Sequence, residues 1–247
     1  MVITLAAFIA GSVIGTAHLP WWTTTPALPP TSLVGAYGAM SGLAISLALF
    51  AAIAVATVVV ERRRHGTLEA SVAGGAGRWL KGPWPLVAGA LGLAVVNIAT
   101  LAVAGRPWGV TVAFALWGAK LLGAVGVPID SWPYWSAPAQ RAALEASVFA
   151  DITTVMDIGI VLGALTATML AGRFAPVWRI PVRSLAAAVI GGLLLGYGAR
   201  IAYGCNIGAY FSGIASGSLH GWLWLFAAFA GNTIGVRLRP MCGLANK

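Results

Sequence analysis

Charged side chains are scarce in this sequence. They make up 9% of its 247 residues, whereas soluble domains carry roughly 25%. A chain with so few charges cannot cover a water-facing surface, which excludes an ordinary soluble domain. Hydrophobic residues, by contrast, make up 59% of the chain, and the mean hydropathy is +0.88. The composition therefore predicts an all-α, polytopic integral membrane protein whose surroundings are the lipid bilayer.

Acidic residues and cysteines are also few. Six Asp and Glu accompany fifteen Lys and Arg, for a net charge of +9. Most of the arginines lie between apolar segments, so this excess is interpreted as an orientation signal and not as a nucleic-acid site. Cys205 and Cys242 are too far apart in sequence to resemble a disulfide framework or a metal site.

Signatures of enzymes are absent from the sequence. There is no phosphate-binding glycine loop followed by Lys-Ser/Thr. His220 follows Cys205 by fifteen residues, but no orienting acid or oxyanion site of a Cys-His hydrolase is apparent. We expect neither an enzyme nor a cofactor.

Seven segments are mostly apolar over about the 20 residues that a spanning helix needs. They are Met1–Ala17, Tyr37–Val60, Pro85–Ala104, Trp108–Val127, Ser147–Leu170, Leu185–Tyr203 and Leu219–Val236. The stretch from Leu19 to Ser32 is rich in Pro and Trp and has no charge, so we expect a rigid interfacial loop there.

Basic residues gather in three clusters between these segments. The clusters are Arg62, Arg63, Arg64, Arg78 and Lys81; Arg173, Arg179 and Arg183; and Arg237, Arg239 and Lys247. The positive-inside rule predicts that all three, and with them the C-terminus, lie in the cytoplasm. Three segments separate the first two clusters, but an even number of crossings is required. Either one of the three does not cross fully or the region 130–150 contains another partial crossing. We favour Trp108–Val127, which contains Lys120, as a re-entrant segment.

Polar residues inside apolar segments usually face a protein interior or a cavity. Those of interest are Asn97, Lys120, Asp151, Asp157, Arg200, Cys205, Asn206, His220 and Asn232. Asp157 is interpreted as the N-cap of the helix that follows it, because Asp is a favoured N-cap. Arg200 could pair with an acid, attract an anion or snorkel from the end of its segment.

Cys205 lies in the sequence YGCNIGA, between glycines at 204 and 208. A buried cysteine by itself is most often a small hydrophobe. Here, however, glycine can free the backbone from helical angles, and a break would expose N–H groups and a helix N-terminus, which favour anions. A neutral thiol can donate a hydrogen bond to a dianion that a thiolate would repel. Together these features predict a site for an anion that contains sulfur.

Glycines also recur four residues apart in the C-terminal half, a spacing that lets membrane helices approach closely. The sets are Gly192 and Gly196; Gly204 and Gly208; Gly213, Gly217 and Gly221; and Gly231 and Gly235. We expect packing faces at the outer pairs and a backbone break at Gly204 and Gly208.

The stretch GLLLGYGARIAYGCNIGAYFSGIASGSLHGW, followed by GNTIGVRLRP, resembles the C-terminal signature of the YeeE/YedE (sulfur transport) family. MDIGIVLGALTATMLAGRF, GTAHLPWW and GRPWGVTVAFALWGAK also look like that family, so the resemblance covers nearly the whole chain. It implies thiosulfate uptake across the bacterial inner membrane by an inverted-repeat fold of spanning and short re-entrant helices. Some members are associated with selenium metabolism, which leaves the anion open.

The resemblance also implies site residues. In this family cysteines line a narrow path and pass thiosulfate along by thiol hydrogen bonds, without covalent chemistry, and the cysteine of YGCNIGA corresponds to Cys205. We expect a single transmembrane domain over 1–247, with 1–127 as the central part of the fold and 128–247 as the C-terminal repeat. The expected path residues are Arg200, Gly204, Cys205, Asn206 and Gly208, with Lys120, Asp151, Asp157 and His220 as secondary candidates.

The chain departs from the family in one respect. Full-length members carry a further N-terminal section with two more path cysteines, in Gly-Arg-Phe-Cys and Gly-Cys-Gly type motifs, and neither occurs here. Cys242 is not treated as a substitute. The chain would then be a fragment, a late start or half of a split transporter, partnered by a second membrane chain and by a small cytoplasmic sulfur carrier. Two alternatives stay open: a membrane-bound protein that forms a persulfide at Cys205, and a half-subunit that does not transport alone.

Overall fold

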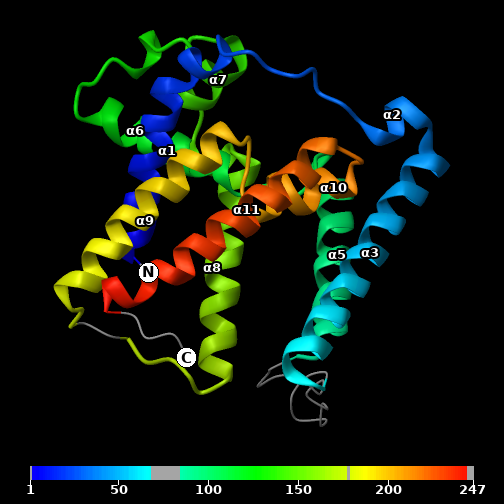
Figure 1. The fold of residues 1–247 in the computed structure, drawn as a ribbon. Coiled ribbons are helices and arrows are strands. Elements are labelled where there is room, and N and C mark those ends of the chain that lie inside the picture. The colour runs from blue at the N-terminus through cyan, green and yellow to red at the C-terminus, as the bar shows by residue number, and fades with distance from the viewer. Residues whose placement is uncertain (1, 68–83, 177–178, 244–247) are drawn as a thin grey trace.

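The computed structural model describes residues 2–67, 84–176 and 179–243, and over these ranges it contains helices and no strand (Figure 1). The α-helices are α1 (Val2–Thr23), α2 (Leu33–Tyr37), α3 (Ala39–His65), α5 (Leu86–Ala104), α6 (Thr111–Ala124), α7 (Pro138–Glu145), α8 (Ile152–Leu170), α9 (Val182–Ile201), α10 (Ser212–Ala215) and α11 (Leu219–Leu238). The shorter turns are η1 (Ile129–Ser131), η2 (Val148–Ala150), the π-helix η3 (Asn206–Phe211) and η4 (Arg239–Cys242).

The predicted all-α, polytopic class is confirmed. The division at residues 127 and 128 stays a prediction.

Five helical stretches in the described ranges are long and apolar enough to cross a membrane: α1, α3, α5, α8 and the stretch Val182–Ala215. The other two predicted segments differ from these. Helix α6 has 14 residues and is about 21 Å long, which is too short for a hydrocarbon core of about 30 Å. This length agrees with the re-entrant segment expected there. Helix α11 has 20 residues but is not among the five, so the crossing expected at Leu219–Val236 stays a prediction.

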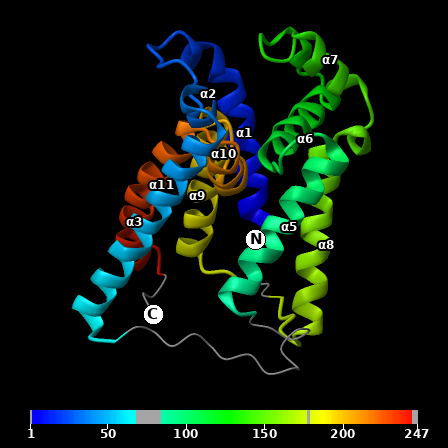
Figure 2. The ribbon, with the colours of Figure 1, turned by 90° about the vertical axis from the view of Figure 1, so that its right-hand side faces the viewer.

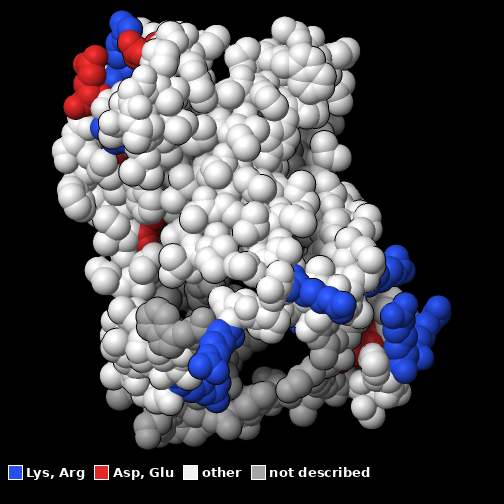
Figure 3. Space-filling view, turned by 90° about the vertical axis from the view of Figure 1, so that its left-hand side faces the viewer, with Lys and Arg blue, Asp and Glu red and all other residues white. Residues whose placement is uncertain are grey.

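The described basic residues of the three clusters lie at one end of the molecule. The end of α3, the connection between α8 and α9, and the end of α11 all lie at the bottom of Figure 1. Arg78, Lys81 and Lys247 belong to the same clusters but lie outside the described residues. Figure 3 shows Lys and Arg side chains toward this end, and others beside Asp and Glu at the opposite end, where Figure 2 shows α7. The clusters therefore share one side, as the crossing count requires.

Helices α1 and α9 pack at backbone contact through glycines. A Cβ atom at Gly196 would collide with the Phe8 carbonyl oxygen, and one at Gly11 with the Leu193 carbonyl oxygen. The Ser12 hydroxyl donates to the Gly196 carbonyl oxygen across this contact at 3.4 Å. The predicted packing role of Gly192 and Gly196 is confirmed. A Cβ at Gly231 or Gly235 would meet no described atom within 4 Å, so that pair is not a packing face within the described residues.

The first helix continues past its predicted end and includes Pro20 and both tryptophans of the expected loop. A helix end leaves carbonyl groups without partners. Here the hydroxyls of Thr23, Thr24 and Thr25 donate to the carbonyl oxygens three residues earlier, at 2.6–2.8 Å. The helix ends at Thr23, where these hydroxyl groups satisfy its last carbonyls, and the loop expected from Leu19 begins only after that residue.

Helix α6 lies against α1, α8 and α9, and six of its 14 residues are buried. Its small residues permit this: Ala113, Ala115 and Ala119 are at most 2% exposed, and a Cβ at Gly118 would collide with Val13 of α1. Ala115 and Ala119 form a cluster with Ile129 and Trp135 from the connection that follows. The helix that is too short to cross is thus held inside protein, where broken backbone is tolerated.

Candidate functional site

The chain breaks out of α9 immediately before Cys205. The Gly204 N–H group still donates to the Ala199 carbonyl oxygen at 2.9 Å, but Tyr203 has φ +55° and Gly204 has φ +155°. A Cβ at Gly204 would lie 2.5 Å from the Ala209 nitrogen. Only glycine fits at this position, so the backbone break expected at Gly204 is present.

Cys205 begins a π-helical turn. Its carbonyl oxygen accepts hydrogen bonds from the N–H groups of Ala209 at 2.9 Å and Tyr210 at 3.3 Å. The second of these bonds spans five residues, a pattern that is rare and frequent at functional sites. The thiol is half-buried and has no hydrogen-bond partner among the described residues, and the Asn206 side chain is exposed. Both side chains therefore have hydrogen-bonding capacity that the described residues do not use.

Two expectations about this break need correction. Gly208 does not have a positive φ, and a Cβ there would meet nothing within 4 Å, so the break itself does not require glycine at 208. The helix expected to present its N-terminus to the thiol consists of six π-helical residues followed by the four of α10. Because the macrodipole sums over aligned peptide units, so short a stretch has only a weak helix field.

Arg200, in the last turn of α9, contacts an aromatic ring. Its guanidinium carbon lies 4.0 Å from the ring centroid of Tyr134. Nε and Nη2 of Arg200 are buried and have no acceptor among the described residues. Of the three possibilities considered from sequence, an ion pair with an acid is not found in the described residues. The chain instead holds a partly buried cation five residues before Cys205.

A hydrogen-bonded connection joins the break to the segment before α6. The Trp108 N–H donates to Asn97 Oδ1 at 3.1 Å, and the Ser212 hydroxyl donates to the Trp108 carbonyl oxygen at 2.8 Å. Asn97 is therefore the residue that ties the Pro-Trp-Gly turn to α5. Sequence reasoning named Asn97 among the polar residues of the spans but did not find this role.

The N-cap of α8 is Asp151 and not Asp157 as predicted. Asp151 Oδ2 accepts from the Thr154 N–H at 2.7 Å and from its hydroxyl at 2.9 Å. The Thr154 hydroxyl also accepts from Trp117 of α6 at 2.9 Å. Asp157 lies more than a turn inside α8, is 3% exposed, and has no donor to either oxygen among the described residues. The prediction failed because both aspartates precede an apolar run, and the helix begins at the earlier one.

The remaining secondary candidates do not gather at Cys205. Lys120 donates from Nζ to the carbonyl oxygens of Leu144 and Ala146, so it ties α6 to the end of α7. His220 is exposed at the start of α11. Within the described ranges there is no group of three or more His, Cys, Asp or Glu side chains that could hold a metal ion.

Cys242 lies at the other end of α9 from Cys205. Its carbonyl oxygen accepts a 3.5 Å hydrogen bond from Ser184, in the first turn of that helix, and 20 helical residues span about 30 Å. Both cysteines are free. The structure therefore separates the second thiol from the break.

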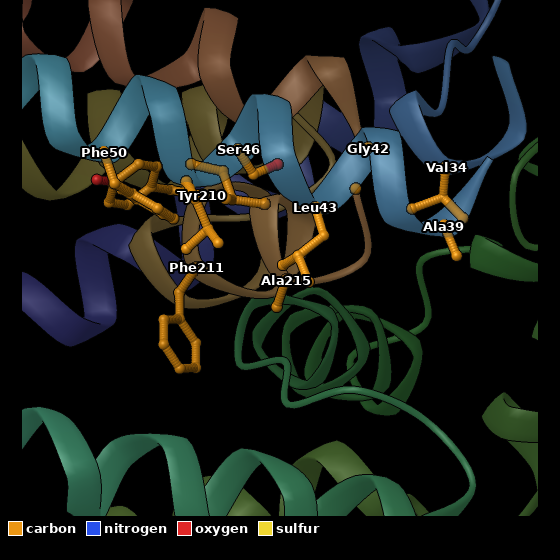
Figure 4. A pocket seen from close by; sticks show the side chains of 12 residues that line it. Val34, Ala39, Gly42, Leu43, Ser46, Phe50, Tyr210, Phe211 and Ala215 are labelled. Carbon is orange, nitrogen blue, oxygen red and sulfur yellow. The ribbon is translucent and has the colours of Figure 1, made fainter. Parts of the chain in front are cut away.

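A cavity of about 370 Å³ lies beside the break, between α3 and the η3–α10 segment (Figure 4). Its walls are Val34, Ala39, Gly42, Leu43, Ser46, Leu47, Phe50, Tyr210, Phe211, Ile214, Ala215 and Gly217. No charged side chain lines it, and Cys205 and Asn206 are not part of its wall. It is an apolar space next to the candidate site and unsuited to an anion. Sequence reasoning did not predict it.

Comparison with known proteins gives the family. The model of the family described as "Sulphur transport" matches residues 1–234. The chain is 32% identical over 162 residues to the "Probable transporter YedE" of Escherichia coli (strain K12), and equally to that of Salmonella typhimurium, covering 64% of this chain and 39% of each relative. It is 42% identical over 76 residues to the "Thiosulfate transporter TsuA" of Spirochaeta thermophila, covering 30% of this chain and 23% of the relative.

These alignments span less than half the length of the curated relatives. No solved structure matches the chain. The family model nevertheless extends over α1 to most of α11 and includes the break at Cys205. The chain therefore belongs to the sulphur transport family of multi-pass membrane proteins.

Proposed function

We propose that this transporter-family protein takes up a small sulfur-containing anion, thiosulfate foremost, with Cys205 as a residue of its path. The observation that carries the proposal is the half-buried thiol at a backbone break next to a membrane-spanning helix, in a chain of the sulphur transport family. Broken backbone inside a membrane protein is usual where substrate binds. The name of the TsuA relative supports thiosulfate as the anion.

Transport would proceed without covalent chemistry. The Cys205 thiol donates a hydrogen bond to the anion, and the exposed Asn206 amide offers a second donor. Gly208 leaves space beside them, because no side chain fills the region around its Cα. Arg200 supplies positive charge near the end of α9. The anion accepts hydrogen bonds from one donor after another along the path, and it leaves the protein chemically unchanged.

The orientation follows from the basic residues. Arg62–Arg64, Arg173, Arg179 and Arg183, and Arg237 and Arg239 share one end of the molecule (Figure 1). We propose that this end, and with it the C-terminus, faces the cytoplasm of a bacterial inner membrane, and the positive-inside rule supports this orientation. A small sulfur-carrier protein is the proposed receiver of the anion on this side.

Uptake of radiolabelled thiosulfate by cells that lack their own uptake system tests the proposal. Cells that express the chain should accumulate label, Cys205→Ala should abolish accumulation while the protein stays in the membrane, and Cys205→Ser should retain part of it because a hydroxyl also donates. Cys242→Ala is the matched control and should transport normally. Normal uptake by Cys205→Ala would refute the assignment of Cys205.

A second candidate function is supported by the coverage of the relatives. The YedE proteins are matched over 39% of their length, and the two other cysteine motifs expected from the family resemblance do not occur in these 247 residues. In this case the chain completes a transporter together with a second membrane chain. Uptake would then require co-expression of a chain with those motifs. Uptake by this chain alone would exclude the split-transporter function.

A further inference from the structure

Arg200 carries a charge that the described part of the protein leaves without a counter-ion. Two of its guanidinium nitrogens, Nε and Nη2, are buried without an acceptor, and the group lies over the ring of Tyr134. A buried N–H group without a partner is costly, and more so when it is charged. A cation–π contact offsets part of that cost but provides no acceptor for these two nitrogens.

The position of Arg200 is fixed from two sides. Its side-chain stem packs on α1, where a Cβ at Gly15 would lie 2.8 Å from Arg200 Cβ and 3.2 Å from its Cγ. One turn earlier, the Tyr197 hydroxyl accepts from Trp22 of α1 at 2.9 Å. Tyr134, on the other side, packs against the buried cluster around Trp135. Such a guanidinium is pre-organised, so binding a ligand costs it little side-chain entropy.

The two unsatisfied nitrogens are on the same guanidinium group, whose fork of donors suits an oxyanion. Arginine binds planar pairs of anionic oxygens through two parallel N–H···O bonds. Arg200 is in the last turn of α9 and precedes Cys205 by five residues in the sequence. A sulfur oxyanion has oxygen atoms that suit the guanidinium and a sulfur end that suits a thiol.

We propose that Nε and Nη2 of Arg200 bind the oxygen atoms of a tetrahedral sulfur oxyanion, and that Tyr134 is the positioning residue that holds the guanidinium for this contact. The inference rests on the proposed function and deepens it. In this proposal Arg200 binds the anion directly. Tyr134, in the connection between η1 and α7, contributes to recognition of the anion by holding the guanidinium.

Thermal unfolding of the purified full chain in lipid nanodiscs, titrated with thiosulfate against equal ionic strength of chloride, tests the proposal. The unaltered protein should gain Tm with thiosulfate, since a ligand that binds only the folded state stabilises it. Arg200→Gln should lose this gain, and Arg200→Lys should keep a small part because lysine lacks the fork. Tyr134→Ala should raise the half-saturating thiosulfate concentration about 3- to 30-fold, the range expected for a lost cation–π contact.

Two controls separate recognition from folding. Tyr134→Phe keeps the ring and should leave the half-saturating concentration unchanged. Arg141→Gln removes an exposed arginine and should also leave it unchanged.

Unchanged binding by both Arg200→Gln and Tyr134→Ala would overturn the inference while leaving Cys205 as a path residue. A fall in ligand-free Tm with unchanged half-saturation would also overturn it, because Arg200 would then be structural. A complete absence of thiosulfate-induced stabilisation in the unaltered protein would count against the proposed function itself.

Discussion

The hydroxyl of Ser212 donates a 2.8 Å hydrogen bond to the carbonyl oxygen of Trp108, a residue 104 positions earlier in the chain. Ser212 follows the π-helical turn that begins after Cys205, and Trp108 belongs to the turn that leads into the short helix α6. The two interruptions expected from sequence, one in each half of the chain, thus meet at a single bond. The contact therefore couples the proposed path residue Cys205 to the segment before α6 through the η3 turn.

Loss of this bond should weaken the junction between the two breaks. Ser212→Ala leaves the part-buried carbonyl of Trp108 with one donor fewer, and we expect a loss of about 0.5–1.5 kcal/mol in unfolding free energy. Thermal unfolding in detergent measures it. Ser216→Ala is the matched control, because Ser216 is exposed and donates only to the nearby Gly213 carbonyl. Equal Tm values for the two variants would contradict the structural role of Ser212.

The glycines at the α1–α9 contact should tolerate no side chain. Gly196→Ala places a methyl group against the Phe8 carbonyl oxygen, and overpacking of this kind costs about 1–3 kcal/mol. Gly231→Ala, in an exposed pair of the same spacing, meets nothing within 4 Å and should leave Tm unchanged or slightly raised. A folded yield for Gly196→Ala equal to that of Gly231→Ala would show that the two helices do not touch as described.

The glycines beside Cys205 should separate folding from transport. Gly204→Ala forces a side chain onto a backbone with φ +155° and against the Ala209 nitrogen, so the protein should lose Tm. Gly208→Ala meets no neighbour, and the fold should survive. Thiosulfate uptake by Gly208→Ala should nevertheless fall, because the methyl group enters space assigned to the guest. Full uptake by Gly208→Ala would remove Gly208 from the path.

Hydropathy and charge predicted much of this fold because both depend on composition along a single segment. The helices α3, α5 and α8 appear where apolar runs of sufficient length predict them. The crossing count required one segment that does not cross, and the structure gives the favoured segment, Trp108–Val127, a helix of only 14 residues. The end of α1 was misplaced because the proline and tryptophans suggested a loop. Three threonine hydroxyls that satisfy its last carbonyls decide the matter instead.

The candidate site was less accessible to sequence reasoning. The break at Gly204 follows from local glycine chemistry and was predicted. The contact of Arg200 with Tyr134 depends on how the η1–α7 connection folds back onto α9, and no local pattern encodes it. The N-cap of α8 was assigned to the wrong aspartate, since Asp151 and Asp157 both precede apolar residues. Only the hydrogen bonds to Thr154 distinguish them.

Asp151 should therefore contribute to stability as a cap. Asp151→Ala removes the acceptor of two hydrogen bonds from Thr154, and the loss of an N-cap costs about 1 kcal/mol. Asp130→Ala, at an exposed aspartate in η1, should change Tm little in the same thermal unfolding experiment. If Asp151→Ala were as stable as Asp130→Ala, the cap would contribute nothing measurable to the fold.

The thiol of Cys205 should be protected by its guest. The side chain is half-buried and free, so a small maleimide should alkylate it in membrane vesicles, and a Cys242→Ala background makes the label specific to this residue. Thiosulfate should slow the labelling rate, and sulfate at equal ionic strength should slow it less, because only thiosulfate has a terminal sulfur atom that can contact the thiol.

Arg200→Gln should weaken the protection without changing the labelling rate in the absence of the anion. Equal protection by both anions would mean that charge alone selects the guest, and it would leave the sulfur of Cys205 without a role in recognition.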